Sequence, residues 1–360
     1  MITTLIMVLL IEGCLRWFAP QIHEHDTLFQ PDKELGWSFI PNAKGRIVYP
    51  GEVNQYVSIN AQGFRDIDFD LDTSKRKIMV IGDSFVTNIA VEADEVFTEV
   101  MESQLDNTAV MNFGVNGYGQ VQELLLLNEW LSKVQPGLII QLVYLRNDFR
   151  DNVKADNWLY PKPTAVLNQE QEVSITPTPK IAIAKASKKE QRKGFLEKLH
   201  LYHFVRNRLG NIAAKTNANN TKFRPPEVDL CAPHLRAEIR TQFEVLQQLL
   251  LQTKEKADAF GVPIVFVLAP SIGQVQDASW EEIRSYADDL PLVRDLPNQR
   301  LMEFAKQHEL SMLDLLPALL DASTAEGLLY NQFEQHWTAR GNALVAQAIL
   351  EFISEINEVN

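Results

Sequence analysis

The 360-residue sequence predicts an α/β fold in which helices cover both faces of a parallel sheet. Five short runs of apolar residues alternate with segments of helical periodicity. Because these runs are continuously apolar, we expect strands that are buried on both faces. The predicted strands are Lys77–Ile81, Ala109–Phe113, Leu138–Leu145, Pro263–Leu268 and Leu310–Leu315. The predicted helices are Glu92–Leu105, Gln120–Val134, Pro233–Phe260, Asn298–His308 and Thr338–Ile356.

The composition excludes several classes of protein. Forty-seven acidic and 34 basic residues give a net charge of −13, which argues against a nucleic-acid binder. The two cysteines, Cys14 and Cys231, exclude a disulfide scaffold and a cysteine-rich zinc site. His23 and His25 lie in a polar cluster without the spacing of metal ligands. We therefore expect no metal and no cofactor.

Residues 1–20 are interpreted as a hydrophobic membrane anchor. The stretch Ile2–Phe18 is mostly apolar, with Glu12 inside it and Trp17 near its end. The uninterrupted part is shorter than the ~20 residues that span a bilayer, so it resembles the latter part of an anchor helix. The alternative is an amphipathic helix packed on the domain. An anchor would hold the remaining chain at a membrane, outside the cytoplasm.

The rest of the chain divides by composition. Residues 21–75 are rich in turn-forming residues and predict loops and short edge strands. Residues 76–360 contain the α/β pattern, which proline-rich and basic sequence interrupts at about 151–230. We expect a partly disordered surface insertion there, with one amphipathic helix. This helix either touches an anionic membrane surface or covers the core.

The first chemical motif is Gly82-Asp83-Ser84-Phe85, directly after the first predicted strand. A strand that ends in a tight turn and opens a helix places the turn side chain at the carboxyl edge of the sheet. Open α/β sheets bind their ligands at this edge. Ser84 would also lie at a helix N-terminus, where free N–H groups favour negative charge. Alone the motif is weak, because serine and aspartate are common helix caps.

Three further blocks are predicted to reach the same region. Glycines in residues 112–119 follow the second strand and let the backbone approach a ligand. Asn147 follows the third strand and can aim its amide at the same edge. Glu334 and His336 precede the last helix; in an extended segment they would face the same side. The carboxylate could then orient the imidazole toward Ser84.

These four blocks, in this order, resemble the SGNH/GDSL hydrolase superfamily. The resemblance covers about Gln30 to Glu351, except for the insertion. The upstream stretches LGWSFIPNA and INAQGFRD are similar to a bacterial branch with an N-terminal membrane segment. The resemblance implies a flavodoxin-like three-layer α/β/α sandwich with a five-stranded parallel sheet.

The resemblance also implies roles for the candidate residues. Ser84 matches the nucleophile and His336 the general base. The N–H groups of Ser84 and Gly117 and the Asn147 amide match an oxyanion hole. Glu334 stands where aspartate is usual. Both a triad with Glu334 and a dyad, in which a backbone carbonyl holds His336, are therefore open.

The implied activity is that of a serine esterase. It would act on a carboxylic ester, an O-acetyl group above all, of a cell-envelope glycan or lipid through an acyl-serine intermediate. Two alternatives are a polysaccharide O-acetyltransferase and a non-catalytic domain that binds glycan. Arg146 departs from the family pattern. It either binds an anionic substrate or pairs with Asp148 or Asp151.

Overall fold

The computed structural model describes residues 2–18, 28–49, 51–157, 160–168, 172–179, 199–206, 208, 224–324 and 327–359. The cluster at His23 and His25 and most of the basic part of the insertion lie outside these ranges.

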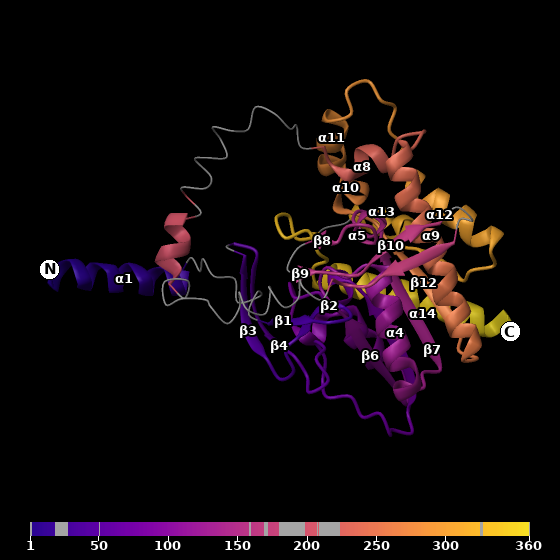
Figure 1. Ribbon diagram of the computed structural model, residues 1–360, viewed down its shortest axis with the longest axis horizontal. Helices are drawn as coiled ribbons and strands as arrows, with labels where there is room; N and C mark the ends of the chain where they lie inside the picture. The colour runs from indigo at the N-terminus through magenta and orange to yellow at the C-terminus, as the bar shows by residue number, and fades with distance from the viewer. Residues whose placement is uncertain are drawn as a thin grey trace.

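The centre of the fold is a sheet of five parallel strands (Figure 1). The strands are β5 (Arg76–Gly82), β6 (Thr108–Gly114), β7 (Leu138–Tyr144), β12 (Ile264–Ala269) and β13 (Met312–Asp314). Their spatial order, β13-β12-β7-β5-β6, is the order 2-1-3-4-5 of flavodoxin-like sheets. The predicted fold class is confirmed. The fifth strand starts later than predicted, because the N–H of Leu310 still bonds to the Ala305 carbonyl of the preceding helix.

Helices cover both faces of this sheet. Side chains alternate along β5, so that Met79 and Ile81 enter one apolar cluster and Ile78 and Val80 enter another. The first cluster includes residues of α4 (Gln120–Val134), α9 (Ala237–Ala259) and α12 (Leu296–Gln307). The second includes residues of α3 (Phe97–Gln104), α13 (Leu316–Ser323) and α14 (Ala339–Val359). The result is a three-layer sandwich.

Some helices differ from the sequence prediction. The segment predicted as one helix from Glu92 contains a 3-10 turn, η2 (Ala93–Glu95), before α3 begins at Phe97. The break falls at Val96, whose backbone is extended. The shortest helices escaped prediction because one turn shows no periodicity. They are α5 (Asp148–Asp151), α8 (Pro226–Leu230) and α10 (Ile272–Val275). The short helix α2 (Ser84–Thr87) begins at Ser84, where the sequence predicted a helix N-terminus. Two longer ones, α11 (Asp277–Ser285) and α13, were also not predicted.

The N-terminal extension forms two antiparallel hairpins. They pair β1 (Phe29–Asp32) with β2 (Gly36–Phe39), and β3 (Lys44–Tyr49) with β4 (Val53–Ser58). Trp37, Phe39 and Phe64 are buried in the same cluster as Met79 of the central sheet. The extension is therefore part of the main hydrophobic core.

The described part of the insertion contains more strand than expected. Two small hairpins pair β8 (Asp156–Asn157) with β9 (Tyr160–Pro161), and β10 (Thr164–Leu167) with β11 (Val173–Thr176). Ala165 of β10 is buried against α4 and α9, so this hairpin covers the core. Residues 200–206 are helical, where an amphipathic helix was expected.

The N-terminal helix α1 (Ile2–Phe18) lies at one end of the molecule (Figure 1). Its Glu12 is buried and accepts hydrogen bonds from the N–H groups of His200 and Leu201, at 3.0 and 2.9 Å. In the described ranges, no helix has both the length and the apolar character needed to cross a membrane. A spanning anchor at residues 1–20 is therefore not supported there.

Candidate active site

The turn between β5 and α2 presents Ser84 at the carboxyl edge of the sheet. Asp83 caps α2, and its Oδ1 accepts a hydrogen bond of 2.8 Å from the N–H of Phe85. A Cβ at Gly82 would lie 2.5 Å from the Val86 side chain, so glycine permits this tight turn. β5 lies between β6 and β7, at the point where the strand order reverses. Ser84 thus lies where this class of sheet binds its ligands.

The structure brings Ser84, His336 and Glu334 into one chain of contacts. Ser84 Oγ lies 2.7 Å from His336 Nε2. His336 Nδ1 makes a short hydrogen bond with Glu334 Oε1, and Glu334 Oε2 accepts the His336 backbone N–H at 3.0 Å. Because an ionised carboxylate only accepts, Nδ1 carries the proton, and Nε2 is left to accept from the Ser84 hydroxyl. This is the geometry of a nucleophile, a base and an orienting acid.

The path of the chain between Glu334 and His336 differs from the prediction. Gln335 has a left-handed backbone with φ of 69°, so the segment is a tight turn and not an extended strand. The N–H of Gln335 bonds to the Asn331 carbonyl, and the N–H of Asn331 bonds to the His336 carbonyl. The glutamate meets the imidazole because the chain turns back on itself. The expected contact between Glu334 and His336 therefore forms, but through a tight turn and not through an extended segment.

Two carboxylates set the charge state of His336. Burial of the ring opposes protonation, but attraction to Glu334, with a further contribution from Asp83, outweighs it. The pKa of His336 is therefore raised above its ordinary value. Burial also raises the pKa of Asp83, to about 6. Protonation of His336 would be favoured as it receives a proton from Ser84.

Backbone donors lie beside the serine and in the loop after β6. Gly117 has a positive φ of 78°, a conformation that favours glycine. Within the described ranges, the N–H groups of Ser84 and Gly117 have no protein acceptor. Both donors are therefore available to a ligand.

Asn147 precedes α5 and is already engaged. Its Nδ2 donates to Asp151 Oδ2 at 2.9 Å. The structure places Asn147 near Asp83 of the nucleophile turn, but no hydrogen bond from Asn147 to Ser84, Glu334 or His336 is seen in the described residues. An amide nitrogen has two hydrogens, so one is left for another acceptor.

Sequence reasoning missed the residues that hold these loops. Buried Arg65 donates to the carbonyl oxygens of Thr87 at 2.9 Å, Val91 at 2.6 Å and Asn88. These carbonyls belong to the last residue of α2 and to the segment after it, so Arg65 fixes the chain behind Ser84. The stretch INAQGFRD predicts a loop or a short edge strand and carries part of the family resemblance. Its arginine carries no periodic signal that would have revealed this contact.

The Gly117 loop is held from two sides. Trp37 donates to the Asn116 carbonyl at 3.0 Å, and the Tyr118 hydroxyl donates to the Trp37 carbonyl at 2.6 Å. From the insertion, the ammonium of Lys162 lies 3.4 Å from the Gly117 carbonyl. Lys162 is 1% exposed, and burial lowers its pKa against the attraction of buried carboxylates. A buried lysine inside a basic, proline-rich segment cannot be recognised from composition.

Arg146 does not form either predicted ion pair. Its Nε lies 2.8 Å from Oε1 of buried Glu227 in α8, and not against Asp148 or Asp151. Asp148 instead accepts hydrogen bonds from the Gln120 amide at 2.6 Å and the Tyr144 N–H at 2.8 Å. Glu227 lies 81 positions away along the chain, so nothing local indicated this pairing.

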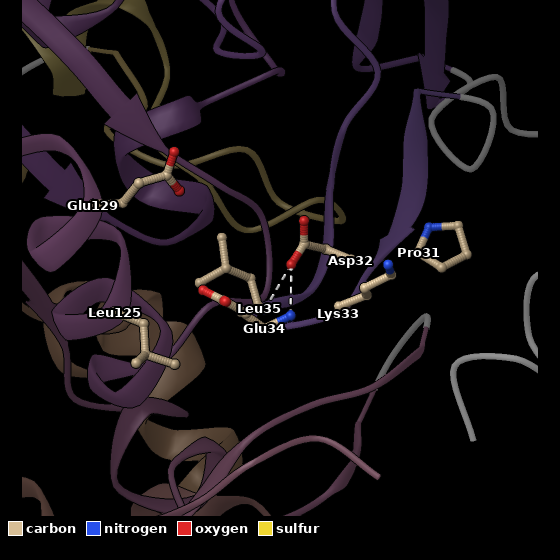
Figure 2. A pocket seen from close by; sticks show the side chains of 7 residues that line it. All are labelled: Pro31, Asp32, Lys33, Glu34, Leu35, Leu125 and Glu129. Atoms are coloured by element: carbon tan, nitrogen blue, oxygen red, sulfur yellow. Dashed lines mark hydrogen bonds between the residues drawn. The ribbon is translucent and has the colours of Figure 1, made fainter. Parts of the chain in front are cut away.

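A pocket of about 400 Å³ lies elsewhere, between the β1–β2 turn and α4 (Figure 2). Figure 2 shows the Asp32 carboxylate folded back on the turn, where it accepts the N–H groups of Glu34 and Leu35 at 2.9 and 2.8 Å. Leu125 and Glu129 line it from α4, and no candidate catalytic residue does. Across the described residues, no group of three or more His, Cys, Asp or Glu side chains could hold a metal ion.

Comparison with known proteins gives matches only among solved structures, since no family model and no curated sequence matches the chain. One match is a member of the lipolytic G-D-S-L family from Veillonella parvula, with 13% identity and a TM-score of 0.39 over 77% of this chain and 97% of that one. The acetyl xylan esterase AlAXEase has 11% identity and a TM-score of 0.39, covering 76% and 98%. The esterase EstA from Pseudoalteromonas sp. has 8% identity and a TM-score of 0.38, covering 79% and 100%. Likeness at this level carries no argument about chemistry, which rests on the residues themselves.

Proposed function

We propose that this protein is a serine ester hydrolase of the SGNH/GDSL type. The observation that carries the proposal is the contact chain from Ser84 through His336 to Glu334. It lies at the carboxyl edge of a flavodoxin-like sheet, at the reversal of strand order. The order of the four sequence blocks along the chain also supports a hydrolase of this type.

The mechanism follows from the atoms in contact. Ser84 Oγ attacks the ester carbonyl carbon while its proton passes to His336 Nε2. The carbonyl oxygen becomes an oxyanion, which the N–H groups of Ser84 and Gly117 and the second amide hydrogen of Asn147 stabilise. The bond to the leaving alcohol then breaks, and His336 protonates that alcohol. A water molecule, deprotonated by His336, attacks the acyl carbon. The bond from that carbon to Ser84 Oγ then breaks, the proton returns from His336 to Ser84 Oγ, and the acid is released.

The substrate we propose is a carboxylic ester, in particular an O-acetyl ester, on a cell-envelope glycan or lipid. If a sugar hydroxyl replaces water in the second step, the same site is an O-acetyltransferase. Product analysis separates the two: free acetate from a p-nitrophenyl acetate assay indicates hydrolysis, and acetylated oligosaccharide from an added acceptor indicates transfer.

A membrane location is proposed from the surface of α1. Leu9, Leu10 and Phe18 of this helix are 62%, 63% and 83% exposed. We propose that the N-terminus associates with a membrane and that the catalytic domain lies outside the cytoplasm. The full chain should then sediment with membranes and resist a high-salt wash, whereas a chain shortened to begin at His23 should not. A full chain in the cytosolic fraction would contradict this proposal.

The decisive test of the proposed function is covalent labelling. A fluorophosphonate should label the wild-type protein, and peptide mapping should place the label on Ser84. The Ser84→Ala variant serves as the control and should take no label. A label on another serine, or none on a folded wild-type protein, refutes the proposal.

A further inference from the structure

Glu52 lies in the turn of the β3–β4 hairpin and reaches the loop that carries Glu334 and His336. Its carboxylate accepts hydrogen bonds from three consecutive backbone N–H groups. Those of Phe333 and Glu334 lie 3.0 and 2.9 Å from Oε2, and that of Gln332 makes a short bond to Oε1. Hydrogen bonds to an ionised acceptor are about twice as strong as neutral ones.

The tip of this loop has one other hydrogen bond to a distant segment among the described residues, from Gln332 Nε2 to Gln276 Oε1 at 3.2 Å. The loop is anchored at its base by the pairing of Tyr330 with Trp337, both fully buried. Between them Gln332 and Phe333 are exposed, Phe333 by 82%. Apolar packing therefore fixes the base of the loop, while the contact with Glu52 fixes its tip.

The contacts run in series from the hairpin to the serine. Glu52 accepts a hydrogen bond from the backbone N–H of Glu334. The Glu334 side chain is bonded to His336 Nδ1, and His336 Nε2 lies against Ser84 Oγ. A small displacement of the loop tip would move the Glu334 carboxylate away from the imidazole. Misplacement by about 1 Å can reduce catalysis by about 100-fold.

We propose that Glu52 is a positioning residue, which holds the loop tip so that Glu334 stays on His336. This inference rests on the proposed hydrolase function. The N-terminal extension would then control the geometry of the catalytic acid from 282 positions away along the chain.

The first test compares Glu52→Gln and Glu52→Ala with the wild-type protein. We expect kcat for p-nitrophenyl acetate to fall about 10-fold in Glu52→Ala with KM little changed, and less in Glu52→Gln, because an amide oxygen still accepts. Asn54→Ala is the matched control, because its side chain contacts Arg46 within the same hairpin and should leave kcat unchanged. If Glu52→Ala fails to fold, Glu52→Gln carries the test.

The second test asks whether Glu52 acts through Glu334. In a Glu334→Gln background, Glu52→Ala should reduce kcat by less than about twofold, because the contact it supports is already lost. A purely structural role would lower kcat by the same factor in both backgrounds. Equal factors would overturn the inference.

The third test does not depend on turnover. The groups that face the His336 ring and set its charge are Glu334 and Asp83. Loss of Glu52 should let Glu334 move away, so the pKa of His336, measured by NMR, should fall in Glu52→Ala and not in Asn54→Ala. An unchanged pKa overturns the inference. A lowered pKa in a protein that takes no fluorophosphonate label would keep the positioning role and refute the hydrolase.

Discussion

Glu334→Gln separates a triad from a dyad, because it removes the charge and keeps the size. The Glu334 side chain is 4% exposed and that of His336 is 18% exposed, so solvent screens this contact little. A hydrogen bond to a charged group contributes about 1.5–3 kcal/mol, which is roughly a 10- to 100-fold change in rate. The amide can also donate to Nδ1 and trap the wrong tautomer, which in a serine triad costs up to about 10⁴-fold.

We therefore expect kcat for p-nitrophenyl acetate to fall by about 10²- to 10⁴-fold, with KM little changed. The pH profile gives a second readout. Activity needs neutral His336, so it falls as the pH drops through the pKa of His336, which Glu334 raises. In the variant this acid limb should move to lower pH. A folded variant that keeps more than about a third of the wild-type kcat would refute the triad in favour of a dyad.

Three further outcomes are expected. Ser84→Ala should abolish ester hydrolysis and leave the thermal midpoint of unfolding within a few degrees of wild type; residual turnover would point to another nucleophile. Lys162→Met removes the buried ammonium that donates to the Gly117 carbonyl and leaves that acceptor unsatisfied, so urea unfolding should reveal a loss of about 1–3 kcal/mol, and an unchanged urea midpoint would contradict this role. Burial raises the pKa of Glu123 from 4.5 to about 8, so its contribution to stability is fully present below pH 4.5 and is lost as the pH rises through about 8. Glu123→Gln should therefore flatten the decline of the urea midpoint between pH 5 and pH 9, and an unaltered decline would exclude Glu123 as its source.

The sheet could be predicted because buried central strands are continuous apolar runs. Val80 and Ile140 lie in the apolar cluster on one face of the sheet, and their neighbours Met79 and Ile139 lie in the cluster on the other face. A strand that is buried on both faces in this way is continuously apolar in sequence. Helix α5 could not be predicted, because Asp148–Asp151 is one turn that is held by contacts with α4 and β7. The sequence therefore predicts elements that are buried along their whole length. It does not predict short elements whose structure depends on contacts with distant segments.

The sequence predicted which residues form the candidate site better than it predicted how the chain places them. Ser84 was expected at the carboxyl edge of the sheet because it follows a buried strand, and His336 was expected beside it from the order of the four sequence blocks. The structure brings the two side chains together. The left-handed Gln335 was not expected, because glutamine has no preference for that conformation. The contacts of Lys162 and Arg65 join segments far apart in the sequence, so no local pattern could reveal them.

The contact between Glu52 of the β3–β4 hairpin and the loop that carries His336 has a consequence for folding during synthesis. Ser84 and His336 are 252 positions apart, and Glu52 lies 281 positions before Phe333. Folds with such long-range contacts form slowly, because the loop must close before the contacts stabilise it. During synthesis the hairpin and the nucleophile turn leave the ribosome long before residues 327–337 do. A nascent chain would therefore carry the serine without its base, and esterase activity would report that these last contacts had formed.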